Sequence, residues 1–127
     1  MIKRTIDIDG RWKVIVYYNV DYNLFNIIEQ SLIDLNCSDE TIYYIRVNME
    51  YHKAKAVTIN NNTIHKSIVL FNKHRTKRDY ANSVVHEAEH IKQSILDVYN
   101  IQDKGEVSAY TVGYIASKML MPIIKLL

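Results

Sequence analysis

The chain contains very few of the residues that cross-link, interrupt or loosen a fold. Its 127 residues include one cysteine, one proline and three glycines. A single cysteine, Cys37, excludes an internal disulfide bond, and the lack of a Gly- or Pro-rich stretch leaves no candidate linker. A chain of this length buries about two-thirds of its unfolded surface, which suffices for a hydrophobic core without staples. The sequence therefore predicts one domain spanning residues 1–127.

The net charge is also small, and the apolar runs are short. A formal charge of +2 gives little attraction for nucleic acid or an anionic membrane. Residues 1–20 lack the apolar segment of a signal peptide. The apolar C-terminal tail is interrupted by Lys118, Pro122 and Lys125, which makes it too short and too broken to span a bilayer. We therefore expect a cytoplasmic protein without a membrane partner.

One basic run departs from this weakly charged background. Lys73, His74, Arg75, Lys77 and Arg78 lie just before a predicted helix. Short charge runs of this kind are usually solvated loops, and that is the interpretation we favour. Contact with an acidic partner or a phosphate backbone is the alternative, although the weak net charge argues against nucleic acid.

Hydrophobic periodicity predicts an α+β fold, a small mixed sheet with an N-terminal helix and two C-terminal helices. Asp9-Gly10 is a strong hairpin dipeptide, and the run Asn60-Asn61-Asn62 predicts a second hairpin turn. Asp21 is a candidate N-cap for the first helix. The predicted elements, in order, are strands 4–9 and 12–20, a helix at 22–36, strands 42–49, 55–59 and 64–71, and helices 79–99 and 104–121.

The most informative feature is the segment His86-Glu87-Ala88-Glu89-His90. On a helix, residues four apart lie on one face, so both imidazoles can reach one metal ion. The Glu that follows the first His can then reach a water molecule on that ion. Zinc lowers the pKa of such a water toward about 7, and the carboxylate takes its proton as the water attacks a carbonyl. His86 and His90 are the predicted metal ligands, and Glu87 is the predicted general base.

The helical wheel supports this interpretation. One side of the predicted helix is an apolar stripe, whereas His86 and His90 lie on roughly the opposite side. A histidine that merely completes a core would lie within the stripe. Two exposed histidines without a metal are the alternative, which requires the match to be accidental. The stripe consists of Val84, Ala88, Ile91, Ile95 and Val98.

A catalytic zinc needs a third protein ligand. A longer motif with a His six residues after His90 is absent, because that position is Leu96. Asp97 lies about 10 Å along the helix from His90, too far for the same ion. Glu106 remains, at the start of the next predicted helix, but Asp103 and Glu106 also resemble a capping box. Small residues share the face of Glu106 and would allow close packing of the two helices: Ala109, Gly113, Ala116 and Ser117.

Taken together, these residues resemble the gluzincin branch of the zincin metallopeptidases. Over residues 80–122 the sequence is similar to the compact ImmA/IrrE-type metallopeptidases of bacteria and phages, through Glu106-x-x-Ala109 and the later Leu120-Met121-Pro122. It also looks like small phage-encoded HExxH proteins, in which a Glu-x-x-Ala-Tyr segment begins a helix. The first half of the chain matches in element order alone.

The resemblance implies a zincin-like domain, with zinc bound by His86, His90 and Glu106 and with Glu87 as base. It also implies that the strand before the active helix, predicted at residues 64–71, is a sheet edge that pairs with extended peptide.

The function expected from these features is zinc-dependent hydrolysis of a peptide bond in a protein or peptide substrate. Tyr110 lies one turn from Glu106 and could hydrogen-bond a ligand residue or stabilise an oxyanion, with simple packing as its alternative role. The alternative function is a catalytically silent zinc-binding interaction or regulatory module of phage or bacterial origin.

Overall fold

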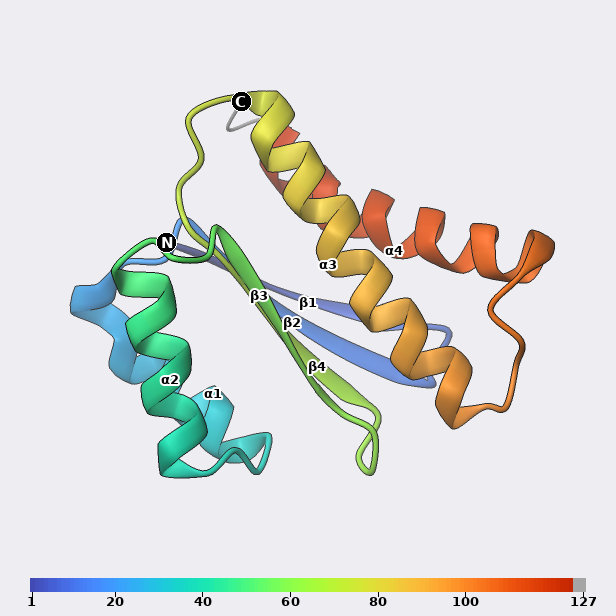
Figure 1. The fold of residues 1–127 in the computed structure, drawn as a ribbon, viewed down its shortest axis with the longest axis horizontal. Helices are drawn as coiled ribbons and strands as arrows, with labels where there is room; N and C mark the ends of the chain where they lie inside the picture. The colour runs from blue at the N-terminus through green and yellow to red at the C-terminus, as the bar shows by residue number, and fades with distance from the viewer. Residues whose placement is uncertain (125–127) are drawn as a thin grey trace.

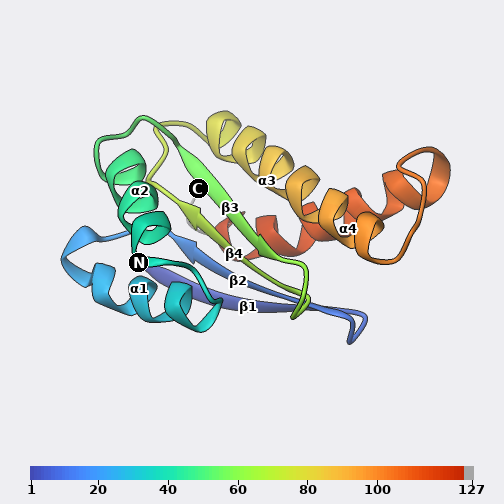
Figure 2. The same ribbon diagram turned by 60° about the horizontal axis from the view of Figure 1, so that its bottom comes forward.

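The computed structural model describes residues 1–124 and has the predicted α+β fold, arranged in three layers (Figure 1). A four-stranded sheet lies between two pairs of helices, with α1 and α2 on one face and α3 and α4 on the other (Figure 2). The strands are β1 (Ile2–Ile8), β2 (Trp12–Tyr18), β3 (Ala56–Asn61) and β4 (Lys66–Phe71). The helices are α1 (Phe25–Asp34), α2 (Asp39–Glu50), α3 (Lys77–Val98) and α4 (Gly105–Ile124), and a short 3-10 helix, η1 (Tyr22–Leu24), precedes α1.

The strand order in the sheet is β1-β2-β4-β3. β2 and β4 are the central pair and run parallel, while each pairs with an antiparallel outer strand. Parallel neighbours need a long connection, and here α1, α2 and β3 all lie between β2 and β4 in the chain. β3 is therefore an edge strand, and α3 follows β4 directly.

Both predicted hairpins form, but the second turn lies later than expected. β1 and β2 join around Asp9 and Gly10, which both have positive φ angles. The second turn was predicted at Asn60–Asn62, whereas β3 continues to Asn61, which pairs with Lys66. The Asn61 side-chain oxygen accepts from the backbone N–H groups of Thr63 and Ile64, so this residue shapes the turn from the end of the strand.

The prediction of a strand at residues 42–49 is wrong, because this segment belongs to helix α2. The Ser38 side chain caps the helix by accepting a hydrogen bond from the backbone N–H of Thr41. Two acidic residues in the first turn also stabilise the helix through attraction to the positive end of its dipole. The buried side chains follow a helical period and form the inner face of α2: Ile42, Ile45 and Met49.

Hydrophobic clusters lie on both faces of the sheet. The central strands alternate their side chains between the two clusters and are buried on both sides, as parallel neighbours usually are. In β4, Val69 and Phe71 face α3 and α4, whereas Ile68 and Leu70 face α1 and α2. The structure thus divides the predicted core into two layers.

The apolar side of α4 packs on α3 and on the sheet. Ile115, Met119 and Ile123 are fully buried in the cluster that also contains the predicted stripe of α3. The hydroxyl of Tyr18 on β2 donates a hydrogen bond of 2.6 Å to the Met119 carbonyl oxygen, which ties the helix to the sheet. α4 therefore packs through its large apolar side chains, and Ala116 is the only member of the small-residue row that packs against this cluster.

By length and composition alone, α4 could also cross a membrane. This differs from the expectation that the C-terminal tail is too broken to do so, because the helix continues through Lys118 and Pro122 for 20 residues. About a fifth of the relevant window is buried in the domain (22%), and a core helix passes the same test. The cytoplasmic location remains a prediction.

We expect Met119→Ala to lower the free energy of unfolding by about 2–5 kcal/mol, because it removes a fully buried side chain between α4 and the sheet. Met121→Ala is the matched control, since the Met121 side chain is 66% exposed. Urea denaturation followed by circular dichroism measures both. Equal effects of the two substitutions would contradict this packing of α4.

Candidate metal centre

The two histidines of the motif lie on the exposed face of α3. Thr76 caps this helix by accepting from the backbone N–H of Asp79, and the helix then runs unbroken past the motif. His86 and His90 are four residues apart, so their rings stand one turn apart and their Nε2 atoms lie 3.2 Å from each other. The predicted stripe of α3 is buried on the other side of the helix, so the sequence placed the histidines on the correct face.

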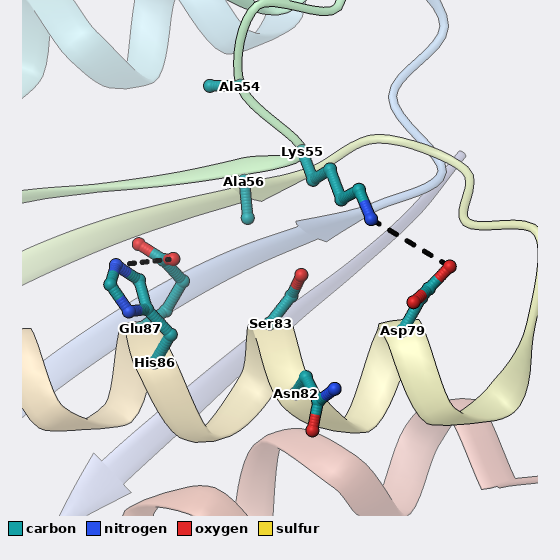
Figure 3. Close-up of a pocket in the computed structure, with 8 residues that line it drawn as sticks. All are labelled: Ala54, Lys55, Ala56, Asp79, Asn82, Ser83, His86 and Glu87. Atoms are coloured by element: carbon teal, nitrogen blue, oxygen red, sulfur yellow. Dashed lines mark ion pairs between the residues drawn. The ribbon is translucent and has the colours of Figure 1, made fainter.

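Glu87 points from α3 into the space between the helix and β3. The residue is 4% exposed, and the Thr58 hydroxyl on β3 donates a hydrogen bond of 2.9 Å to Oε1. The other carboxylate oxygen, Oε2, lies 3.9 Å from Nε2 of His86 (Figure 3). A buried carboxylate is costly unless it is hydrogen-bonded, so Thr58 both stabilises Glu87 and fixes its orientation beside His86.

The distances test whether these residues fit a metal ion. Two nitrogens bound to one tetrahedral zinc at about 2.0–2.1 Å stand about 3.3 Å apart, close to the 3.2 Å between the histidine nitrogens. One ligand atom each from His86, Glu87 and His90 lies within 4.8 Å of the others, and residues 1–124 contain no other such cluster. Without a metal, the same distance allows a hydrogen bond between the two rings. The donor set suits zinc and other divalent ions.

The structure does not bring Glu106 to this cluster. Glu106 lies in the first turn of α4 and is exposed, about 180° around the helix from buried Ile115. Ser108, two residues later, contacts Lys92 on α3 at 3.0 Å. Lys92 lies about 200° around α3 from His90, so the first turn of α4 lies on the far side of α3 from the histidines. The expected convergence depended on the small-residue row, of which Ala109, Gly113 and Ser117 are exposed and only Ala116 packs against the core.

The capping role considered for Glu106 is replaced by a different interaction. Asp103 lies before α4 and accepts a hydrogen bond of 2.7 Å from Lys92, which also pairs with Glu89 at 2.6 Å. Lys92 is only 5% exposed, and the carboxylates of Asp103 and Glu89 raise its pKa. Glu89, Lys92 and Asp103 thus anchor the connection between α3 and α4. The Glu89–Lys92 pair is a local i,i+3 contact, whereas the pairing of Lys92 with Asp103 depends on tertiary packing.

Tyr110 is also not placed to hydrogen-bond a metal ligand or an oxyanion at the histidine pair. Its side chain is 79% exposed on α4, where it borders a shallow apolar surface with Gly113, Tyr114 and Ser117. The groove beside the histidines is lined instead by residues of α3 and the start of β3, with Ser83 one turn before Glu87 (Figure 3). Tyr110 therefore neither packs in the core nor lines this groove.

The sheet edge beside the histidines is β3, not the strand predicted at residues 64–71. That segment contains β4, which lies between β2 and β3. β3 runs beside α3 and contacts the motif twice, through Thr58 on Glu87 and through the Asn60 amide, which donates to the His90 carbonyl oxygen at 3.3 Å. Within residues 1–124, β4 is the only strand that pairs with β3.

Sequence reasoning placed His74 in the basic loop and missed its contact with the groove. Its Nδ1 lies 2.6 Å from the Asn72 carbonyl oxygen, which can only accept, so Nδ1 carries the proton. In the neutral ring, Nε2 then accepts from the Ser83 hydroxyl at 2.7 Å. The ring stacks on Tyr80, and burial lowers the pKa of His74 below its ordinary value. A neutral imidazole therefore orients the Ser83 hydroxyl at the groove.

No family model matches the chain, and neither the curated proteins nor the solved structures contain a match. The site is therefore interpreted from its own geometry and from the residues of the motif.

The lowered pKa of His74 predicts a pH dependence of stability. The unfolded chain takes up a proton near the ordinary pKa of 6.5, more readily than the folded protein does. The free energy of unfolding is therefore unaffected by His74 above that pH and decreases as the pH falls through it. In chelator-containing buffer, we expect urea denaturation to show a larger loss between pH 7.5 and 5.5 for the wild type than for His74→Gln (pH range about the histidine pKa). Parallel losses in both proteins would contradict the assignment.

Proposed function

We propose that the protein is a zinc-dependent hydrolase of peptide bonds, with His86 and His90 holding the metal and Glu87 acting as general base. The observation that carries the proposal is the 3.2 Å separation of the histidine nitrogens beside the buried carboxylate of Glu87. A zinc ion bound there would polarise a carbonyl group and lower the pKa of a water molecule.

The position of Glu87 suits a proton acceptor. Thr58 occupies Oε1, which leaves Oε2 as the oxygen nearest the histidine pair. At 3.9 Å from His86 Nε2, Oε2 is farther than the roughly 3.3 Å expected between two ligands of one zinc, so the carboxylate stands beside the metal position. From there it would accept a proton from the attacking water and return it to the leaving amine.

The edge strand gives a reason to favour a peptide substrate. A strand with one unpaired edge can hydrogen-bond an extended peptide backbone, and β3 lies directly beside the histidines. A peptide bound along this edge would pass the groove that His86 and Glu87 line. The backbone contacts would hold the peptide independently of its side chains, so they do not define the substrate sequence.

The decisive experiment is Glu87→Gln, measured for zinc affinity and for hydrolysis. Purified wild type should contain zinc and cleave members of a quenched fluorescent peptide library. The variant should keep zinc and lose cleavage about a hundredfold or more, because an amide cannot take the proton. Calorimetric titration with zinc and fluorescence release measure the two properties. A wild type that binds no zinc, or a variant that cleaves normally, would refute the proposal.

A second candidate function is a zinc-binding module without turnover. The observation that favours it is the placement of Glu106 on the far side of α3, because Glu87 is then the remaining carboxylate for a third ligand. In that case Glu87 would bind the metal and could not act as base. The same experiment separates the two candidates, since Glu87→Gln would then weaken zinc binding.

Substitution of the predicted third ligand tests the arrangement of α4. We expect Glu106→Gln to leave zinc affinity within about threefold of the wild type, because its side chain lies outside the cluster, whereas His90→Ala should weaken binding about a hundredfold or more. Calorimetric titration with zinc compares the two variants. A large loss in Glu106→Gln would show that α4 rearranges to bring its first turn to the metal.

A further inference from the structure

The groove beside His86 and Glu87 continues into a second pocket at the N-terminal end of α3. The two share Lys55, which precedes β3, and Asp79, in the first turn of α3. The second pocket is lined by His52, Lys55, Lys73, His74, Arg75 and Asp79. A ligand that lies in the groove at the histidine pair can therefore extend into this second pocket.

The second pocket is strongly cationic. Its lining contains three basic side chains, Lys55, Lys73 and Arg75, and one carboxylate, Asp79. Asp79 pairs with Lys55 at 3.8 Å, a long and exposed contact that contributes little to stability (Figure 3). Within residues 1–124, Lys73 and Arg75 form no ion pair with a carboxylate. Their charges are therefore available to a ligand.

Hydrogen bonds within the protein show which of these groups can bind a ligand. His74 is held neutral by burial and uses both ring nitrogens, on the Asn72 carbonyl and on Ser83, so it contributes shape and no charge. The exposed side chains of Lys73 and Arg75 carry several N–H donors each, which suit carboxylate oxygens.

We infer that Lys55, Lys73 and Arg75 form a basic subsite that binds acidic side chains of a peptide lying along the groove. The inference rests on the proposed function and names its substrate class, a peptide segment rich in Asp or Glu. Lys55 lies three residues before Thr58, which contacts Glu87, and an extended strand rises about 3.3 Å per residue. The acidic residues should therefore lie about two to four positions from the bond that is cleaved.

Two observations favour a peptide over nucleic acid. Single-stranded nucleic acid is usually bound by aromatic side chains that stack on its bases, and the described residues that line the groove and the basic subsite include no Phe, Tyr or Trp. The adjoining edge of β3 instead offers backbone groups spaced for an extended peptide.

The test uses the full chain carrying Glu87→Gln, so that a bound peptide is not cleaved. Fluorescence anisotropy measures a labelled twelve-residue peptide of alternating Ala and Glu, and the same peptide with Gln in place of Glu. We expect the Glu peptide to bind at least tenfold more tightly, and the triple variant K55Q/K73Q/R75Q to lose that difference, because about three charge-assisted contacts are removed. Equal binding of the two peptides would overturn the inference.

The matched control replaces three exposed cations of β1 and β2, Lys3, Arg4 and Lys13, with Gln; β1 is the sheet edge opposite β3. This variant has the same net charge as the subsite variant, so it should keep the preference for Glu within about twofold if the contact is local. Equal losses in both triple variants would show general attraction to a cationic protein and overturn the inference. Lys73→Glu gives a check that does not depend on weakened binding. This variant should bind a peptide with Lys in place of Glu more tightly, relative to the Glu peptide, than the parent protein does.

Two further measurements separate this inference from the proposed function. The double variant H86A/H90A should still prefer the Glu peptide, because the subsite contains neither histidine. If zinc binding and cleavage fail while this preference persists, the proposed function falls alone. If the wild type cleaves the Glu and Gln peptides equally, the subsite falls alone.

A twelve-nucleotide single-stranded DNA that binds more tightly than the Glu peptide, and only with the subsite intact, would overturn the inference in favour of nucleic acid.

Discussion

The candidate site depends on the contact between helix α3 and edge strand β3. Glu87 enters this contact as a buried carboxylate, and the Thr58 hydroxyl satisfies one of its oxygens. A buried charge without such a partner would be expensive, so the pairing constrains the position of α3 along β3. The histidines then stand at the exposed margin of the same contact, where a peptide backbone can approach. The candidate metal site, the groove and the edge strand therefore form one geometric unit.

The opposite side of α3 packs against α4 and the segment that leads to it. Its apolar stripe and Lys92 contact α4 and the connection to it, so this face fixes the C-terminal part of the fold. The division explains why Glu89, although it lies inside the motif, does not enter the candidate metal site. Glu89 is paired with Lys92, and Lys92 with Asp103. It also explains why the helix after the motif does not supply a metal ligand.

The basic subsite is formed mainly by the two loops that lead into β3 and α3, the elements that carry the candidate metal site. The chain passes from α2 through residues 51–55 into β3, and from β4 through residues 72–76 into α3. The two loops lie at the same end of the sheet, so Lys55 of the first loop and Lys73 and Arg75 of the second line one pocket although they are distant in sequence. His74 joins the second loop to Ser83 and stacks on Tyr80, which holds this loop against the helix.

The sequence by itself determined the features that depend on local periodicity and local chemistry. It predicted the α+β class, both hairpins, helices α1, α3 and α4, and the face of α3 that carries His86 and His90, because helical and strand periods are written in consecutive residues. It missed α2, although Ser38 and the spacing of Ile42, Ile45 and Met49 held the signal. Only the tertiary structure decided that β3 is the edge strand, that Thr58 holds Glu87 and that Glu106 faces away. These features depend on which face of each element is buried against which neighbour. On α4, burial of the large apolar side chains around Ile115 outweighs the close helix–helix approach that the small residues would permit.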